Sequence, residues 1–195
     1  MNNSDLILEN EVLINIKDIK LNGIHNYMNI MAASLASHIA GISNKSIRQV
    51  LKEFTGVEHR LEFVKELNGI RYVNDSKATT VESLAVALQS FKNPIVLIAG
   101  GKDKGSDFSK LNNLIDKFTR EVILIGNAKE KISKSWASIK PVHFADTLED
   151  AVQLATQIAH EKDTVLLSPA CASFDMFKDF EDRGKQFKNI VNSLN

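Results

Sequence analysis

Residues 74–80, Asn-Asp-Ser-Lys-Ala-Thr-Thr, concentrate groups that bind anions directly before a predicted helix. Free amides and hydroxyls at a helix start favour a negative charge, and Lys77 adds a positive one. The carboxylate of Asp75 could instead accept hydrogen bonds from hydroxyl groups such as those of a ribose. Thr79 or Thr80 could simply cap the helix. A cap needs only one such residue, so six polar residues together favour a binding site.

Two further loops have compositions that suit a ligand. Residues 100–107, Gly-Gly-Lys-Asp-Lys-Gly-Ser-Asp, combine glycines, which let the backbone approach a ligand, with lysines that bind carboxylate or phosphate. Their order is not that of a Walker A loop, and a solvated turn explains them equally well. Residues 168–173, Ser-Pro-Ala-Cys-Ala-Ser, follow an apolar run, and an ordinary strand-to-helix turn is the alternative. Residues 126–127, Gly-Asn, are interpreted as a plain turn.

Short apolar runs and helical patterns alternate along the chain, and this order predicts how the loops are positioned. It indicates right-handed βαβ units and a Rossmann-like α/β fold, with a mostly parallel sheet and helices on both faces. Ligands bind at the carboxyl edge of such sheets. The last helix is expected to carry Phe177, Phe180 and Phe187 on one face. Strands are expected at 70–74, 95–99, 122–125, 142–144 and 165–167, and helices at 81–88, 111–118, 129–136, 148–160 and from residue 174 to about 194.

Asn68-Gly69 predicts a β-hairpin at the start of this fold, because Asn-Gly accepts the positive φ angles of a type I′ turn. Upstream, residues 5–20 predict a small hairpin followed by two helices. Ser43 is expected to be the N-cap of the second helix. The first helix is expected to have an apolar face with Tyr27, Met31, Leu35 and Ile39. We interpret residues 1–57 as the end of a preceding domain and residues 58–195 as a complete domain.

The composition argues against several classes of function. Lys+Arg and Asp+Glu both number 24, so no basic excess indicates a nucleic-acid or membrane partner. The single cysteine, Cys171, excludes an internal disulfide and is interpreted as a packed small side chain. The five histidines show no metal-ligand spacing, so no metal site is predicted. No apolar run reaches the roughly 20 residues of a membrane span, and no signal-peptide pattern is found, so a cytoplasmic location is expected.

Taken together and in order, these motifs resemble those of the Mur ligases. The matching stretches are residues 75–79, 100–104 and 167–184, together with residues 23–29 and 56–60. The resemblance covers nearly the whole chain, and residues 167–184 are most similar to the members that add D-glutamate. It implies an ATP-dependent, amide-bond-forming ligase of peptidoglycan precursor synthesis. In such enzymes ATP phosphorylates the L-alanine carboxylate of UDP-N-acetylmuramoyl-L-alanine, and the amine of D-glutamate attacks the acyl phosphate.

The resemblance also implies which residues contact ATP. Asn26 and Asn29 would lie near the adenine, Arg60 would reach the phosphates, and Asp75 would hold the ribose. Magnesium would also be required, with its ligands mostly in an upstream part of the enzyme.

For D-glutamate, the resemblance implies binding of the two carboxylates by Thr79, Lys104, Ser173 and the backbone at Phe180. Lys77 would add positive charge near the reacting groups, so Lys77 and Lys104 are the expected catalytic residues.

The sequence departs from the family pattern at two positions. Thr80 stands where family members usually have asparagine, and Ile24 stands where arginine or lysine is common. The phosphate-binding P-loop, a modified lysine and the uridine-binding N-terminal domain are not found in this sequence. We therefore expect a remnant of the central ATP-binding domain (residues 1–57) and the C-terminal domain (residues 58–195), inactive without upstream central and N-terminal domains. The alternatives are a sister amide ligase, such as another Mur ligase or a folylpolyglutamate synthase, and a non-catalytic amino-acid-binding module.

Overall fold

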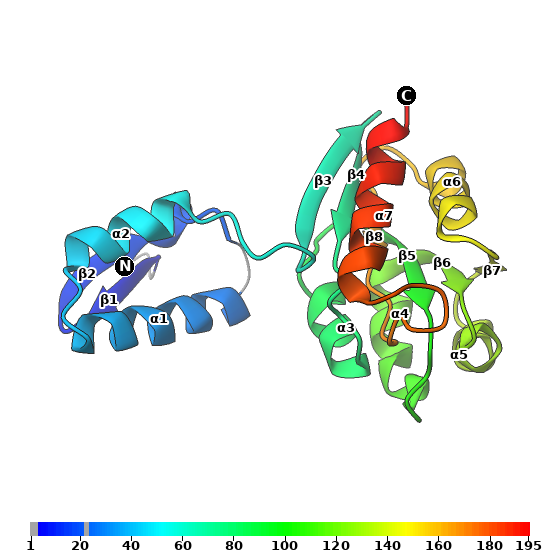
Figure 1. The fold of residues 1–195 in the computed structure, drawn as a ribbon, viewed down its shortest axis with the longest axis horizontal. Helices are drawn as coiled ribbons and strands as arrows, with labels where there is room; N and C mark the ends of the chain where they lie inside the picture. The colour runs from blue at the N-terminus through cyan, green and yellow to red at the C-terminus, as the bar shows by residue number, and fades with distance from the viewer. Residues whose placement is uncertain (1–3, 22–23) are drawn as a thin grey trace. The chain divides into compact units, whose positions relative to one another are not determined.

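The computed structural model describes residues 4–21 and 24–195 (Figure 1). The chain divides into two compact units, Met1–Val57 and Glu58–Asn195. The interpretation of the first unit as the end of a longer domain stays a prediction.

The first unit is a β-hairpin with two helices. Strands β1 (Asp5–Leu8) and β2 (Glu11–Asn15) pair antiparallel, and a 3-10 turn (Ile16–Asp18) leads towards helices α1 (Ile24–Ile39) and α2 (Asn44–Glu53). Its core consists of Leu8, Leu13, Ile14, Ile19, Ile30 and Ile47. The predicted hairpin and both helices are confirmed.

The capping of α2 is confirmed, whereas the predicted apolar face of α1 is partly wrong. The hydroxyl of Ser43 accepts a hydrogen bond from the amide of Ser46 over 3.2 Å. On α1, Ile30 and Ser34 are buried, but Leu35 and Ile39 are 46% and 77% exposed. A strict interval of four residues drifts around a helix of 3.6 residues per turn, so its later members leave the buried face.

The second unit contains a six-stranded sheet in the order β3-β4-β8-β5-β6-β7. Strands β3 (Glu62–Leu67) and β4 (Ile70–Asn74) form the predicted hairpin, with positive φ angles at Asn68 and Gly69. Every other pairing is parallel. The remaining strands are β5 (Ile95–Gly100), β6 (Thr119–Ile125), β7 (Val142–Phe144) and β8 (Thr164–Leu167). The predicted α/β fold with a mostly parallel sheet is confirmed.

Helices cover both faces of this sheet, which explains the continuous apolar runs of its central strands. On β5, Ile95, Leu97 and Ala99 pack in one core cluster, whereas Val96 and Ile98 pack in the other. The first cluster contains residues of α3 (Val81–Leu88), the 3-10 turn Phe108–Leu111, α4 (Asn112–Phe118) and α5 (Lys129–Trp136). The second contains residues of α6 (Leu148–Ile158) and α7 (Phe180–Ser193). Among the described residues, no helix is both long and apolar enough to cross a membrane.

Strand β8 is the last in sequence but lies between β4 and β5 (Figure 1). The carboxyl ends of these parallel strands therefore lie at one edge. The start of α7 differs from the prediction, because the helix begins at Phe180 and Phe177 precedes it. Asp179 is the N-cap, and its side chain accepts a hydrogen bond from the amide of Asp182 over 2.7 Å. This cap stops the helix from extending back to residue 174.

Candidate functional site

The loops after β4 and β8 are joined by backbone hydrogen bonds at the carboxyl edge of the sheet. The amide of Asp75 donates to the carbonyl of Leu167 over 2.8 Å, and the amide of Ala170 donates to the carbonyl of Ala78 over 2.9 Å. The two polar loops that the sequence singled out, residues 74–80 and 168–173, therefore lie side by side.

The loops after β5 and β6 lie close to the loops after β4 and β8, and glycines allow this close approach. Lys102 and Ala172 form an isolated antiparallel bridge, with amide-to-carbonyl distances of 2.8 and 3.1 Å. A Cβ atom on Gly101 would lie 2.4 Å from the carbonyl oxygen of Ala172, and one on Gly126 would lie 2.7 Å from Cα of Gly101. The glycines thus let the loops contact one another. The interpretation of Gly126 as part of a plain turn is incomplete, since it is needed for this contact.

Asp75 is a buried carboxylate at the centre of the site. One oxygen accepts a hydrogen bond from the hydroxyl of Ser168 over 2.8 Å, and the other accepts from the amide of Leu61 over 3.1 Å. Burial raises the pKa of Asp75 to about 6, although both hydrogen bonds and the nearby charge of Arg60 act in the opposite direction. A buried carboxylate with a raised pKa, placed where the loops meet, makes Asp75 a candidate functional residue.

Arg183 connects two site loops. It lies in the matching stretch 167–184, but no role was predicted for it. Its side chain is fully buried. Its Nε donates to the hydroxyl of Ser76 over 2.9 Å, and one terminal nitrogen donates to the carbonyl of Ser76 over 2.8 Å. Both terminal nitrogens donate to the carbonyl of Cys171 over 3.3 Å. Burial lowers the pKa of Arg183 to about 10. An arginine in the first turns of a helix is usually solvated, so nothing in its local sequence distinguishes it.

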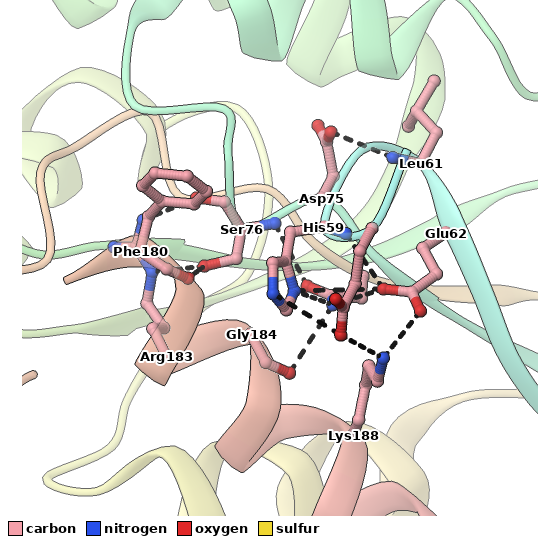
Figure 2. A network of polar contacts seen from close by, with 11 residues as sticks. His59, Leu61, Glu62, Asp75, Ser76, Phe180, Arg183, Gly184 and Lys188 are labelled. Carbon is pink, nitrogen blue, oxygen red and sulfur yellow. Dashed lines mark hydrogen bonds and ion pairs between the residues drawn. The ribbon is translucent and has the colours of Figure 1, made fainter. Parts of the chain in front are cut away.

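A polar network fixes the segment that precedes β3 (Figure 2). Lys188 Nζ donates to Glu58 over 2.8 Å and to Glu62 over 2.7 Å. The other oxygen of Glu62 accepts from the amide of His59 and from the Asn74 side chain, each over 3.0 Å. The network joins this segment to β4 and α7.

The same segment contacts the loop after β4. The carbonyl of His59 accepts a hydrogen bond from the amide of Lys77 over 3.0 Å. The hydroxyl of Ser76 donates to the carbonyl of Phe180 over 2.8 Å. The rings of His59 and Phe180 meet edge to face, with centroids 6.2 Å apart. Lys77 Nζ lies 5.7 Å from the centroid of the Phe180 ring. The loop after β4 is therefore held by the segment that precedes β3 and by the start of α7.

Among the described residues, one group has the proximity of metal ligands: Glu58, His59 and Glu62. It does not fit Mg²⁺, which prefers an octahedron of oxygen ligands. The ammonium of Lys188 already bridges the two glutamates. We therefore assign this group as an ion-pair network.

Residues 59–171 match the protein family described as Mur ligase, glutamate ligase domain, which is more than half of the chain. The chain belongs to the Mur ligase family. Curated relatives of this Mur ligase chain include two named UDP-N-acetylmuramoylalanine–D-glutamate ligase. The protein of Caldanaerobacter subterraneus subsp. tengcongensis is 47% identical over 193 residues, 97% of this chain and 43% of the relative. That of Aquifex aeolicus is 44% identical over 191 residues, 97% of this chain and 46% of the relative. The chain thus spans less than half of these relatives' lengths.

Solved structures have the same fold at lower identity. The UDP-N-acetylmuramate-alanine ligase of Thermotoga maritima aligns with a TM-score of 0.67 and 22% identity, over 90% of this chain and 39% of that one. The folylpolyglutamate synthase of Thermotoga maritima aligns with a TM-score of 0.64 and 19% identity, over 95% and 42%. At these identities the alignments support the fold alone.

In this Mur ligase fold, the residues expected to contact D-glutamate lie on the joined loops after β4, β5 and β8, or next to these loops. Ser173 is buried, Thr79 is half-buried, and Lys77 and Lys104 are exposed. Phe180 is the first residue of α7 and is half-buried. Their roles stay predictions.

The residues expected to contact ATP belong to both units. Arg60 is exposed and Asp75 is buried, both in the second unit. Asn26, half-buried, and Asn29, exposed, lie on α1 of the first unit. Their roles also stay predictions.

Proposed function

We propose that this chain is the C-terminal part of the ATP-dependent ligase that adds D-glutamate to UDP-N-acetylmuramoyl-L-alanine in peptidoglycan precursor synthesis. One observation carries the proposal. The polar loops after β4, β5 and β8 lie side by side at the carboxyl edge of a parallel sheet, in a chain 47% identical over 193 residues to a relative with that name. The expected compartment is the cytoplasm.

In this proposal residues 58–195 form the domain that binds D-glutamate. The ammonium of Lys104, the hydroxyls of Thr79 and Ser173 and the backbone at Phe180 would hold its two carboxylates. Charge-assisted hydrogen bonds of this kind are the strong ones, and they suit a dianionic amino acid. Lys77 would stabilise negative charge that develops as the amine attacks the acyl phosphate.

Residues 1–57 would be the end of the central ATP-binding domain. Asn26 and Asn29 would contact the adenine, Asp75 the ribose and Arg60 the phosphates. ATP supplies the phosphoryl group that activates the L-alanine carboxylate. The group Glu58, His59 and Glu62 does not fit Mg²⁺. In this proposal the ligands of the metal would lie mostly in an upstream part of the enzyme. The chain alone is therefore expected not to turn over substrate, and it needs the central and N-terminal domains.

Titration of the chain with D-glutamate, followed by amide NMR, tests the binding role. We expect shifts at Thr79, Lys104 and Ser173, and an affinity for L-glutamate at least about tenfold weaker, which corresponds to about 1.4 kcal/mol. Shifts elsewhere only, or none, would contradict the role of residues 58–195.

Lys104→Ala and Lys102→Ala form a matched pair in the same loop. Lys104→Ala should weaken D-glutamate binding at least about tenfold, whereas Lys102→Ala should have little effect because its backbone bridge to Ala172 remains. Equal losses would indicate a general charge effect rather than a specific contact.

The same titration separates the alternatives. Preference for another amino acid would favour a sister Mur ligase or a folylpolyglutamate synthase.

The ligase activity is tested by phosphate release. The chain alone is compared with a completed enzyme, in which the upstream domains of a relative are joined to this chain. Only the completed enzyme should release phosphate. If the completed enzyme binds D-glutamate but forms no amide, the alternative of a non-catalytic binding module would be favoured.

A further inference from the structure

The loop after β5, residues 100–107, is fixed on both sides of Lys104, which is exposed. At its first end, the bridge between Lys102 and Ala172 ties the backbone to the loop after β8. Lys102 precedes Lys104 by two positions, and Ala172 directly precedes Ser173. The bridge thus holds together the two segments that carry Lys104 and Ser173.

At its other end, the loop is fixed by a buried aromatic pair. Phe108 and Trp136 meet edge to face with centroids 6.0 Å apart, and Trp136 Nε1 donates to the carbonyl of Phe108 over 3.1 Å. Both side chains are almost fully buried. Between these two ends, the path of the backbone depends on the side chain of Asp103.

The carboxylate of Asp103 closes a turn around Lys104. Its Oδ1 accepts hydrogen bonds from the amides of Gly105 over 3.0 Å and Ser106 over 2.9 Å. Its Oδ2 accepts from Lys131 Nζ of α5 over 2.7 Å. Burial alone would raise the pKa of Asp103, but the bonds from Lys131, Ser106 and Gly105 outweigh it and lower the pKa. The carboxylate is therefore ionised at neutral pH.

We propose that Asp103 is a positioning residue for D-glutamate binding, which orders the turn that presents Lys104 beside Ser173. This inference rests on the proposed function, in which Lys104 holds a substrate carboxylate. A loop that is ordered before binding does not lose that conformational freedom when the ligand arrives, so the affinity is higher. Asp103 itself touches no substrate in this arrangement.

Two substitutions separate the turn from the ion pair. Asp103→Asn keeps a side-chain oxygen that can accept from both amides, as Asn does in such turns, but it loses the negative charge. Asp103→Ala loses both. We expect Asp103→Ala to weaken D-glutamate binding at least about tenfold and Asp103→Asn to stay within about threefold, because a partly exposed ion pair contributes little.

Lys131→Ala and Lys134→Ala provide the matched control on α5. Lys131 forms the ion pair with Asp103. Lys134, one turn along, is exposed, and its side chain makes no hydrogen bond or ion pair with any residue that the structure describes. Lys131→Ala should weaken binding by no more than about threefold, and Lys134→Ala should not change it.

Amide NMR on the 195-residue chain measures both the order of the turn and the binding of D-glutamate. The hydrogen exchange of Gly105 and Ser106 should be at least about tenfold faster in Asp103→Ala than in the unsubstituted chain, and restored in Asp103→Asn. Unchanged exchange, or an Asp103→Ala chain that binds D-glutamate as tightly as the unsubstituted one, would overturn the inference. If the unsubstituted chain does not bind D-glutamate, the binding role in the proposed function fails, while the exchange rates still decide whether Asp103 orders the turn.

Discussion

The side-chain amide of Asn74 donates a hydrogen bond to Nδ1 of His59 over 2.9 Å, and both residues are buried. The amide of Ser76 donates to Oδ1 of Asn74 over 3.1 Å, which fixes the orientation of the Asn74 amide group. Nδ1 of His59 must therefore accept, so in a neutral ring the proton is on Nε2. Nε2 lies 3.7 Å from a carboxylate oxygen of Glu58. These contacts hold the ring against Gly184 of α7.

The fixed ring of His59 predicts that Gly184→Ala destabilises the chain. A Cβ atom at residue 184 would lie 2.2 Å from Nδ1 of His59. Within a helix, alanine is favoured over glycine by about 1 kcal/mol, so a purely local effect would be stabilising. We expect instead a loss of at least about 2 kcal/mol in the free energy of unfolding, measured by chemical denaturation.

Removal of the ring provides the control for this prediction. In a His59→Ala background, Gly184→Ala should be neutral or stabilising, because the obstructing atom is absent. A stabilising effect of Gly184→Ala with His59 present would contradict the assignment.

The buried carboxylate of Asp75 predicts a pH dependence of stability. The folded state binds a proton with a pKa of about 6, raised from 3.8. Between these values the folded state holds more protons than the unfolded state, so stability falls as the pH rises. The free energy of unfolding, relative to that of Asp75→Asn, should fall by up to about 3 kcal/mol between pH 4 and pH 7.5. Denaturation curves at several pH values measure this difference. Asp18→Asn, at an exposed aspartate, should show no comparable pH-dependent difference.

The sequence predicted the elements whose local pattern agrees with their surroundings. For the apolar run of β5 and the Asn68-Gly69 turn, the conformation that the local sequence prefers is also the one that the fold requires. Their positions were therefore predicted correctly. The site contacts that were missed depend on residues far apart in the chain. Gly184 is required by His59, and Arg183 is buried by loops that contain Ser76 and Cys171. No pattern near residue 184 indicates either contact.

Arg183→Lys should destabilise the chain although it keeps the charge. The planar guanidinium donates to the carbonyls of Ser76 and Cys171 together, and one ammonium group cannot replace this geometry. Unsatisfied buried carbonyls cost about 1–3 kcal/mol each, so we expect a loss of about 3 kcal/mol in unfolding free energy. Lys185→Arg, at the exposed neighbouring position two residues on, should change it by less than about 0.5 kcal/mol. Equal stability of Arg183→Lys and the unsubstituted chain would show that the fork of donors is not required.

Cys171 is predicted to be unreactive in the folded chain. Its side chain is buried, and burial together with the nearby charge of Asp103 raises the pKa of the thiol to about 12. The thiolate is the reactive form of cysteine, so at pH 8 almost none is present. Labelling by iodoacetamide should be at least about a hundredfold slower in the folded chain than in denaturant, where the pKa returns to about 8.5. Cys171→Ala should keep D-glutamate binding within about twofold, since its carbonyl, which accepts from Arg183, is unchanged. Rapid labelling of the folded chain, prevented by D-glutamate, would instead identify Cys171 as an accessible group of the binding site.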